Sequence, residues 1–125
     1  MKQIMAIQTT FLEKAEYLIA EVSGQWEKYD AIKTIDTICN EANRRDKIRI
    51  LIDIRHLIPP SSDLDYFYTG TYFAKLLCPP FKTATLWTME DYSRFAEFVA
   101  VNYGAQVASF FEKDEALKWL LEGNN

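Results

Sequence analysis

The order of apolar and polar residues along the chain predicts alternating strands and helices. Between residues 26 and 43 the apolar positions recur every three or four residues, which is the spacing of one helix face. Between residues 47 and 57 an isoleucine stands at every second position from 48 to 54, and β-branched residues at this density favour a central strand. Pro59-Pro60 and Pro79-Pro80 interrupt the pattern, because proline cannot donate a backbone hydrogen bond. Each proline pair therefore marks the end of an element.

The complete pattern predicts the order strand, strand, helix, strand, helix, strand, helix, strand, helix. The predicted strands cover about residues 4–10, 17–22, 47–57, 83–88 and 106–111, and the predicted helices cover about residues 26–43, 63–77, 90–103 and a final segment from about 114. The first two strands are expected to pair as a hairpin around Glu13 and Lys14. Helices between the later strands require crossovers, and crossovers make a mainly parallel sheet. We therefore expect one α/β domain spanning residues 1–125.

The predicted helix after Pro59-Pro60 has a polar start and an aromatic body. Ser62 is followed three residues later by Asp65, which resembles a capping box with Ser62 as the N-cap. Eight large apolar side chains spread around most of the helix: Leu64, Tyr66, Phe67, Tyr68, Tyr72, Phe73, Leu76 and Leu77. Aromatic surface in excess of one buried stripe is typical of interfaces and apolar pockets. Either loops and the regions of Trp26 or Trp87 cover the excess, or the helix forms a dimer contact, a partner-binding face or a pocket.

Composition excludes several classes of function. With 14 Lys and Arg against 18 Asp and Glu the net charge is -4, so no basic field attracts nucleic acid. Cys39 and Cys78 lack the spacing of a zinc or redox site, and a single histidine makes a metal site improbable. No glycine-rich phosphate loop occurs, and no apolar segment approaches the roughly 20 residues of a membrane helix. We expect a cytoplasmic protein without metal, cofactor or membrane insertion.

Four residues close in sequence invite a catalytic interpretation. Asp53, His56, Ser61 and Ser62 include the three residue types of a serine hydrolase triad. In a regular strand, however, Asp53 and His56 point to opposite faces, and neither serine lies in a G-x-S-x-G turn. We therefore predict that the protein is not an enzyme. Asp53 and Arg55 share a face, where they either pair with each other or line the mouth of a ligand site.

Three segments of the chain resemble the SpoIIAA-like proteins, a branch of the STAS-like fold to which the anti-sigma factor antagonists belong. They are the strand ILIDIR with the serine-containing helix start after it, the strand after FKTA, and the closing VASFFEKDEALKWL. The strongest signal is the spacing of Phe110, Glu115, Ala116, Leu117, Trp119 and Leu120, which describes packing. The resemblance implies a STAS-like α/β fold and a non-enzymatic regulatory module.

The resemblance also implies where binding occurs. In the antagonists the turn after the central strand carries an Asp-Ser pair, and a partner kinase phosphorylates the serine. Ser61 and Ser62 occupy the matching place here, without the preceding aspartate. The implied surface for a protein partner or a second copy of the chain comprises Ser61, Ser62, Asp63, Tyr66, Tyr68, Tyr72 and Phe73. Some relatives are grouped with lipid-binding SEC14-like modules, which implies a small apolar ligand as the alternative.

Overall fold

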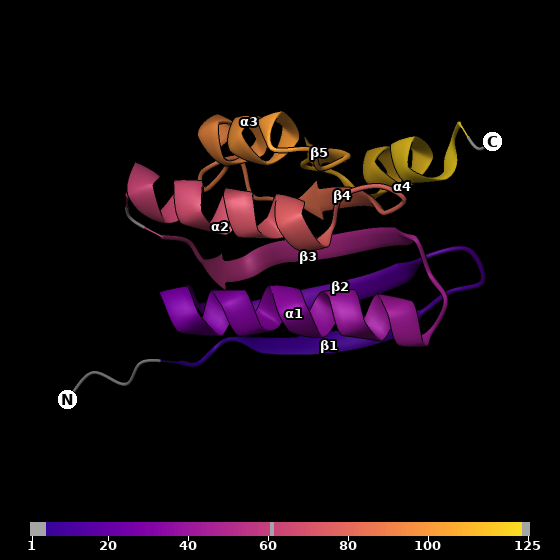
Figure 1. Cartoon of the computed structure of the whole chain (residues 1–125), viewed down its shortest axis with the longest axis horizontal. Helices are drawn as coiled ribbons and strands as arrows, with labels where there is room; N and C mark the ends of the chain where they lie inside the picture. Colours follow the sequence, from indigo (N-terminus) through magenta and orange to yellow (C-terminus); the bar gives the residue numbers. More distant parts are fainter. Residues whose placement is uncertain (1–4, 61, 124–125) are drawn as a thin grey trace.

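The computed structural model describes residues 5–60 and 62–123, and its elements follow the predicted order (Figure 1). The strands of this described part are β1 (Gln8–Glu13), β2 (Leu18–Gln25), β3 (Arg49–Ile58), β4 (Lys82–Leu86) and β5 (Val107–Phe110). Its helices are α1 (Lys28–Arg44), α2 (Asp63–Leu76), α3 (Arg94–Asn102) and α4 (Lys113–Leu121). None of these helices is long and apolar enough to cross a membrane.

The strands form one sheet in the order β1-β2-β3-β4-β5. β1 pairs with β2 antiparallel, and all later neighbours are parallel, as the crossovers predict. α1 and α2 lie side by side in front of the strands (Figure 1), and α3 packs beside α2 over β5. α4 lies on the opposite face, where Ala116 and Leu120 pack against Leu51 of β3 and Leu86 of β4. The sheet is therefore covered by three helices on one face and by one helix on the other.

The helix boundaries follow from caps that the sequence contains. The carboxylate of Glu27 accepts hydrogen bonds from the backbone N–H groups of Tyr29 and Asp30 and starts α1. The Ser62 hydroxyl accepts one from the N–H of Asp65, at 3.3 Å, and is the N-cap of α2, as predicted. The helix expected from about residue 90 begins only at Arg94, because Ser93 caps it.

The first strand was predicted too early in the chain. β1 is Gln8–Glu13, not residues 4–10, and residue 4 lies outside the described residues. The chain reverses between Lys14 and Tyr17, where the N–H of Lys14 donates to the carbonyl of Tyr17 at 2.9 Å. The hairpin turn therefore follows Glu13 and is not centred on it.

β3 contains a β-bulge that the regular alternation of its residues does not predict. Asp53 pairs with Glu21 and His56 pairs with Ser23, so β3 advances three residues while β2 advances two. The extra residue reverses the side on which later residues lie, and Ile54 and Leu57 both pack against the core under α1 and α2. Asp53 and His56 border one hollow on the other face. The prediction that they point to opposite faces is therefore wrong.

Candidate functional site

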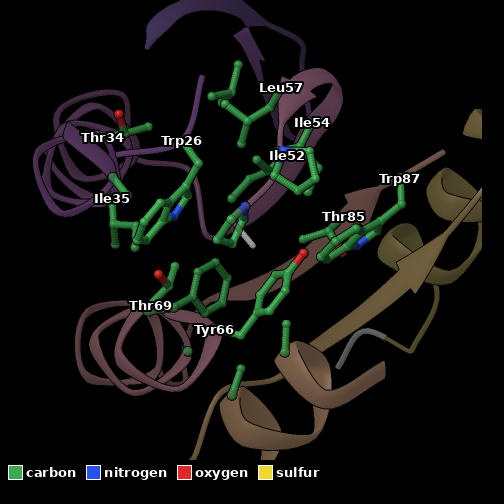
Figure 2. Close-up of a pocket in the computed structure, with 18 of the residues that line it drawn as sticks. Trp26, Thr34, Ile35, Ile52, Ile54, Leu57, Tyr66, Thr69, Thr85 and Trp87 are labelled. Carbon is green, nitrogen blue, oxygen red and sulfur yellow. The ribbon is translucent and has the colours of Figure 1, made fainter. Parts of the chain in front are cut away.

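A cavity of about 160 Å³ lies between the sheet and the three helices α1, α2 and α3. It is situated at the carboxyl ends of the parallel strands, which is where open α/β sheets usually bind their ligands. Figure 2 shows side chains pointing into it from α1, from the end of β3, from α2 and from β4. Its wall is mainly apolar and includes Val22, Ile35, Ile52, Ile54, Leu57 and Phe73. The arrangement is suited to an apolar molecule.

The cavity exists because short side chains stand where the three helices face one another. Thr34 on α1, Gly70 on α2 and Ala96 on α3 all line it. A Cβ atom on Gly70 would lie 2.9 Å from Cγ1 of Val99, so only glycine lets α2 and α3 approach this closely. At the amino ends of the strands the same core layer is filled by large, fully buried side chains, namely Leu18, Ile50 and Leu77. The core layer is therefore close-packed at one end and open at the other.

Two tryptophans border the cavity, and their indole N–H groups differ. Nε1 of Trp87 donates to Oγ1 of Thr85 at 2.8 Å, and this hydroxyl lies 3.2 Å from Oγ of Ser109. Nε1 of Trp26 is buried and has no hydrogen-bond acceptor among the described residues. Both rings line the cavity, from opposite sides in Figure 2. Of the two indole N–H groups, one therefore has an acceptor and the other has none among the described residues.

The remaining polar wall of the cavity is acidic or neutral. Burial raises the pKa of the Tyr66 hydroxyl, and the nearby carboxylates of Asp91 and Asp63 raise it further, so this phenol stays protonated. Asp91 and Glu97 also line the cavity. None of the described lining residues is a lysine, arginine or histidine. The cavity therefore offers no cation to a negatively charged ligand.

The opposite face of β2 and β3 carries a second, polar hollow of about 250 Å³, lined by Gln8, Thr10, Glu21, Val22, Ser23, Asp53 and His56. Arg55 donates to the Asp53 carboxylate through Nε at 3.0 Å and through Nη2 at 2.8 Å. Burial raises the pKa of Asp53, but the hydrogen bonds from Arg55 outweigh burial and hold this pKa below its ordinary value. The expected mutual ion pair of Asp53 and Arg55 is therefore confirmed. Ser62 does not line this hollow and therefore forms no catalytic triad with Asp53 and His56, and Ser61 lies outside the described residues.

The structure divides the predicted binding residues between surface and interior. Ser62, Asp63 and Tyr68 are exposed, and Ser61 lies outside the described residues. Tyr66 and Phe73 line the cavity, whereas the Tyr72 hydroxyl donates to Asp36 of α1 at 2.7 Å. Since α2 lies between α1 and α3, its neighbours cover much of its aromatic surface.

The sequence interpretation did not identify most of the cavity wall. The residues that it missed as site residues include Trp26, Thr34, Ile54, Leu57, Thr85 and Trp87. Trp26 and Trp87 had been considered only as covers for the aromatic helix. Each tryptophan follows directly after a parallel strand, and this position is the one sequence signal that could have identified them as site residues.

Comparison with known proteins gives structural but no sequence matches. No protein-family model matches the chain, and no curated protein matches it. A protein from Shewanella loihica PV-4, described as a DUF3478 family member with a SpoIIAA-like fold, matches with a TM-score of 0.56 and 21% identity over 96% of this chain and 98% of its own. An anti-sigma factor antagonist from Mycobacterium paratuberculosis matches with a TM-score of 0.66 and 11% identity over 91% of this chain and 93% of its own. The chain has the SpoIIAA-like, STAS-like fold that its sequence predicted.

Proposed function

We propose that the protein is a non-enzymatic binding module that holds a small apolar molecule in the cavity between the sheet and the three helices. The observation that carries this proposal is the apolar cavity of about 160 Å³ at the carboxyl ends of the strands. Cavities of about this size in protein cores bind benzene-sized molecules. The ligand would contact α1, α2 and α3 together, so its binding would affect the outer surfaces of these helices.

The test uses two threonines of α1 that differ in their access to the cavity. Thr34 lines the cavity, whereas Thr37 is exposed. Their hydrogen bonds are alike, because each hydroxyl donates to the backbone carbonyl four residues earlier, at 2.7 Å for Thr34 and at 2.8 Å for Thr37. Ethylbenzene is titrated into the labelled protein, and amide chemical shifts report binding. We expect Thr34→Leu to abolish the shifts of cavity-lining residues and Thr37→Leu to preserve them. Absence of binding to the unmodified protein, or equal binding by both variants, would overturn the proposal.

A second candidate function is binding of a protein partner, or of a second copy of the chain, through the turn before α2 and the outer side of this helix. Exposed large apolar side chains on and beside α2 and α3 favour it: Leu64, Tyr68, Phe95, Phe98, Val101 and Tyr103. Such a surface is typical of interaction sites. The likeness to an anti-sigma factor antagonist supports a regulatory role of this kind.

Cys39 and Cys78 are free thiols, which suits the proposed cytoplasmic location.

Self-association tests this second function directly. Light scattering over a hundredfold range of concentration should show a dimer that Tyr68→Ala weakens, while Thr71→Ala on the same helix leaves the mass unchanged. A monomer at every concentration would contradict self-association.

Phosphorylation of Ser61 or Ser62 stays a prediction, which mass spectrometry of protein from the native host would check. A phosphate on Ser62 would meet the amino end of α2, which favours negative charge, but Asp63 and Asp65 would repel it.

A further inference from the structure

The geometry points to a ligand that carries an uncharged hydrogen-bond acceptor, bound by the indole N–H of Trp26. This inference rests on the proposed function of the cavity. The backbone N–H of Trp26 donates to the carbonyl of Ile58 at 2.8 Å, which holds the residue against the end of β3. Its indole projects from there into the cavity (Figure 2), and Nε1 is buried without an acceptor among the described residues. A buried donor without a partner is unfavourable, and a ligand acceptor would remove the penalty.

Trp87 is an internal reference for this argument. It lines the same cavity, but its indole N–H donates to Thr85 within the protein. The fold therefore supplies an acceptor for one of the two indole N–H groups and leaves the other buried in the cavity wall without one among the described residues. Apolar pockets generally orient their ligands through a small number of such polar groups. Trp26 is thus the place where the cavity distinguishes a ligand with an acceptor from a plain hydrocarbon.

The charges around the cavity decide which acceptor is suitable. Asp91 and Glu97 line it, and no described lining residue carries a positive side chain. A carboxylate or phosphate on the ligand would lose its hydration without gaining a counter-charge and would be repelled by these two acids. The Tyr66 phenol remains neutral beside Asp91, so it adds no positive charge. The suitable acceptor is a ketone, aldehyde, ester, ether or amide oxygen.

The volume of the cavity limits the apolar part of the ligand. A space of about 160 Å³ is close to that of an engineered cavity of about 150 Å³ that binds benzene. One ring, or a chain of similar volume, therefore fills this space. Acetophenone meets both conditions. Ethylbenzene matches its shape without the carbonyl, and benzoate matches its ring with a charged group in place of the ketone.

The experiment follows the tryptophan indole signals of the ¹⁵N-labelled full chain during titration with acetophenone, ethylbenzene and benzoate. The signals are assigned with Trp26→Phe, Trp87→Phe and Trp119→Phe. We expect the indole proton of Trp26 to move downfield with acetophenone and to stay nearly unchanged with ethylbenzene. Trp26→Phe should weaken acetophenone by about three- to tenfold, the effect of one hydrogen bond, and change ethylbenzene affinity by less than about twofold. Benzoate should bind at least about tenfold more weakly than acetophenone.

The outcomes separate this inference from the proposed function. Trp119, which packs on the α4 face, supplies the matched control, and its replacement should leave both affinities unchanged. Equal weakening of acetophenone and ethylbenzene by Trp26→Phe, or benzoate binding as tight as that of acetophenone, overturns the inference while the cavity remains a ligand site. Failure of both neutral probes to bind the unmodified protein overturns the proposed function as well. The indole shift in the unmodified protein decides the matter even where Trp26→Phe folds poorly.

Discussion

The two faces of the sheet are packed in different ways. On the α4 face, Leu51, Leu86, Ala116 and Leu120 are completely buried against one another. On the other face three helices must meet over the strands, and short residues at their junction leave the cavity. A single helix can follow the twist of a sheet closely, whereas three helices fill the space between them only where their side chains are long enough. The sheet beneath α4 is therefore scaffold, and the three-helix face is where the chain has room for an apolar ligand.

The largest effect on the free energy of unfolding is expected from shortening a buried side chain on the α4 face. Leu120→Ala removes a fully buried side chain from a filled layer and should lower the free energy of unfolding by about 2–5 kcal/mol. Ile35→Ala on the other face should cost about 2 kcal/mol, at the low end of the same range, because Ile35 borders the cavity and has fewer contacts to lose. Urea denaturation followed by circular dichroism measures both. A larger loss for Ile35→Ala would contradict the comparison.

The next effect concerns the polar hollow beside β2 and β3. Arg55→Met leaves the buried Asp53 carboxylate without its side-chain donor and should cost about 1–3 kcal/mol at pH 7. In the unmodified protein the pKa of Asp53 is lowered, so this stabilisation is present above the ordinary carboxyl pKa of about 4 and is lost as the pH falls below it. The difference between the two proteins should therefore shrink on acidification.

Urea midpoints between pH 3 and pH 7 measure this pH dependence. Lys33→Met is a suitable control, since it removes an exposed positive charge of α1 that forms no ion pair with any described side chain. A difference between Arg55→Met and the unmodified protein that stays constant with pH would show that Asp53 does not cause the loss.

Local patterns in the sequence were sufficient for the order of the elements and for most of their buried faces. The apolar positions that recur at helical spacing between residues 26 and 43 are Ala31, Ile35, Ile38 and Ala42, and all four are buried in α1. Such a stripe depends only on the helical period, which is visible in the sequence. The cap at Ser62 is equally local, since its hydrogen bond spans three residues.

The features that the sequence did not reveal depend on residues far apart in the chain. The bulge in β3 is defined by its pairing with β2, so alternation within β3 alone predicted the wrong side for His56. The cavity depends on how α1, α2 and α3 meet, and it brings Thr34 near Gly70 and Ala96. The unsatisfied indole of Trp26 is likewise visible only when every potential acceptor around it has been placed.

A smaller effect is expected where α2 and α3 touch beside the cavity. Gly70→Ala places a Cβ atom 2.9 Å from Val99, and this overlap should outweigh the gain of about 1 kcal/mol in helix propensity. We expect a net loss of about 1 kcal/mol, measured by thermal and urea denaturation. Combining Gly70→Ala with Val99→Ala should give a smaller loss than the sum of the single changes. Simple additivity of the two changes would show that the close contact does not limit the packing of these helices.

The smallest effect has the opposite sign and concerns the empty space itself. Thr34→Leu places extra apolar volume in the cavity but loses the hydrogen bond of the Thr34 hydroxyl, so it should raise the ligand-free free energy of unfolding by about 0.5–1 kcal/mol. Thr37→Leu makes the same chemical change on an exposed position of the same helix, so its gain is limited to helix propensity, a few tenths of a kcal/mol. Urea denaturation of both ligand-free variants measures the difference. Equal gains from the two changes would mean that the cavity offers the new side chain no additional burial, whereas a larger gain for Thr34→Leu would mean that the open cavity lowers the stability of the ligand-free protein.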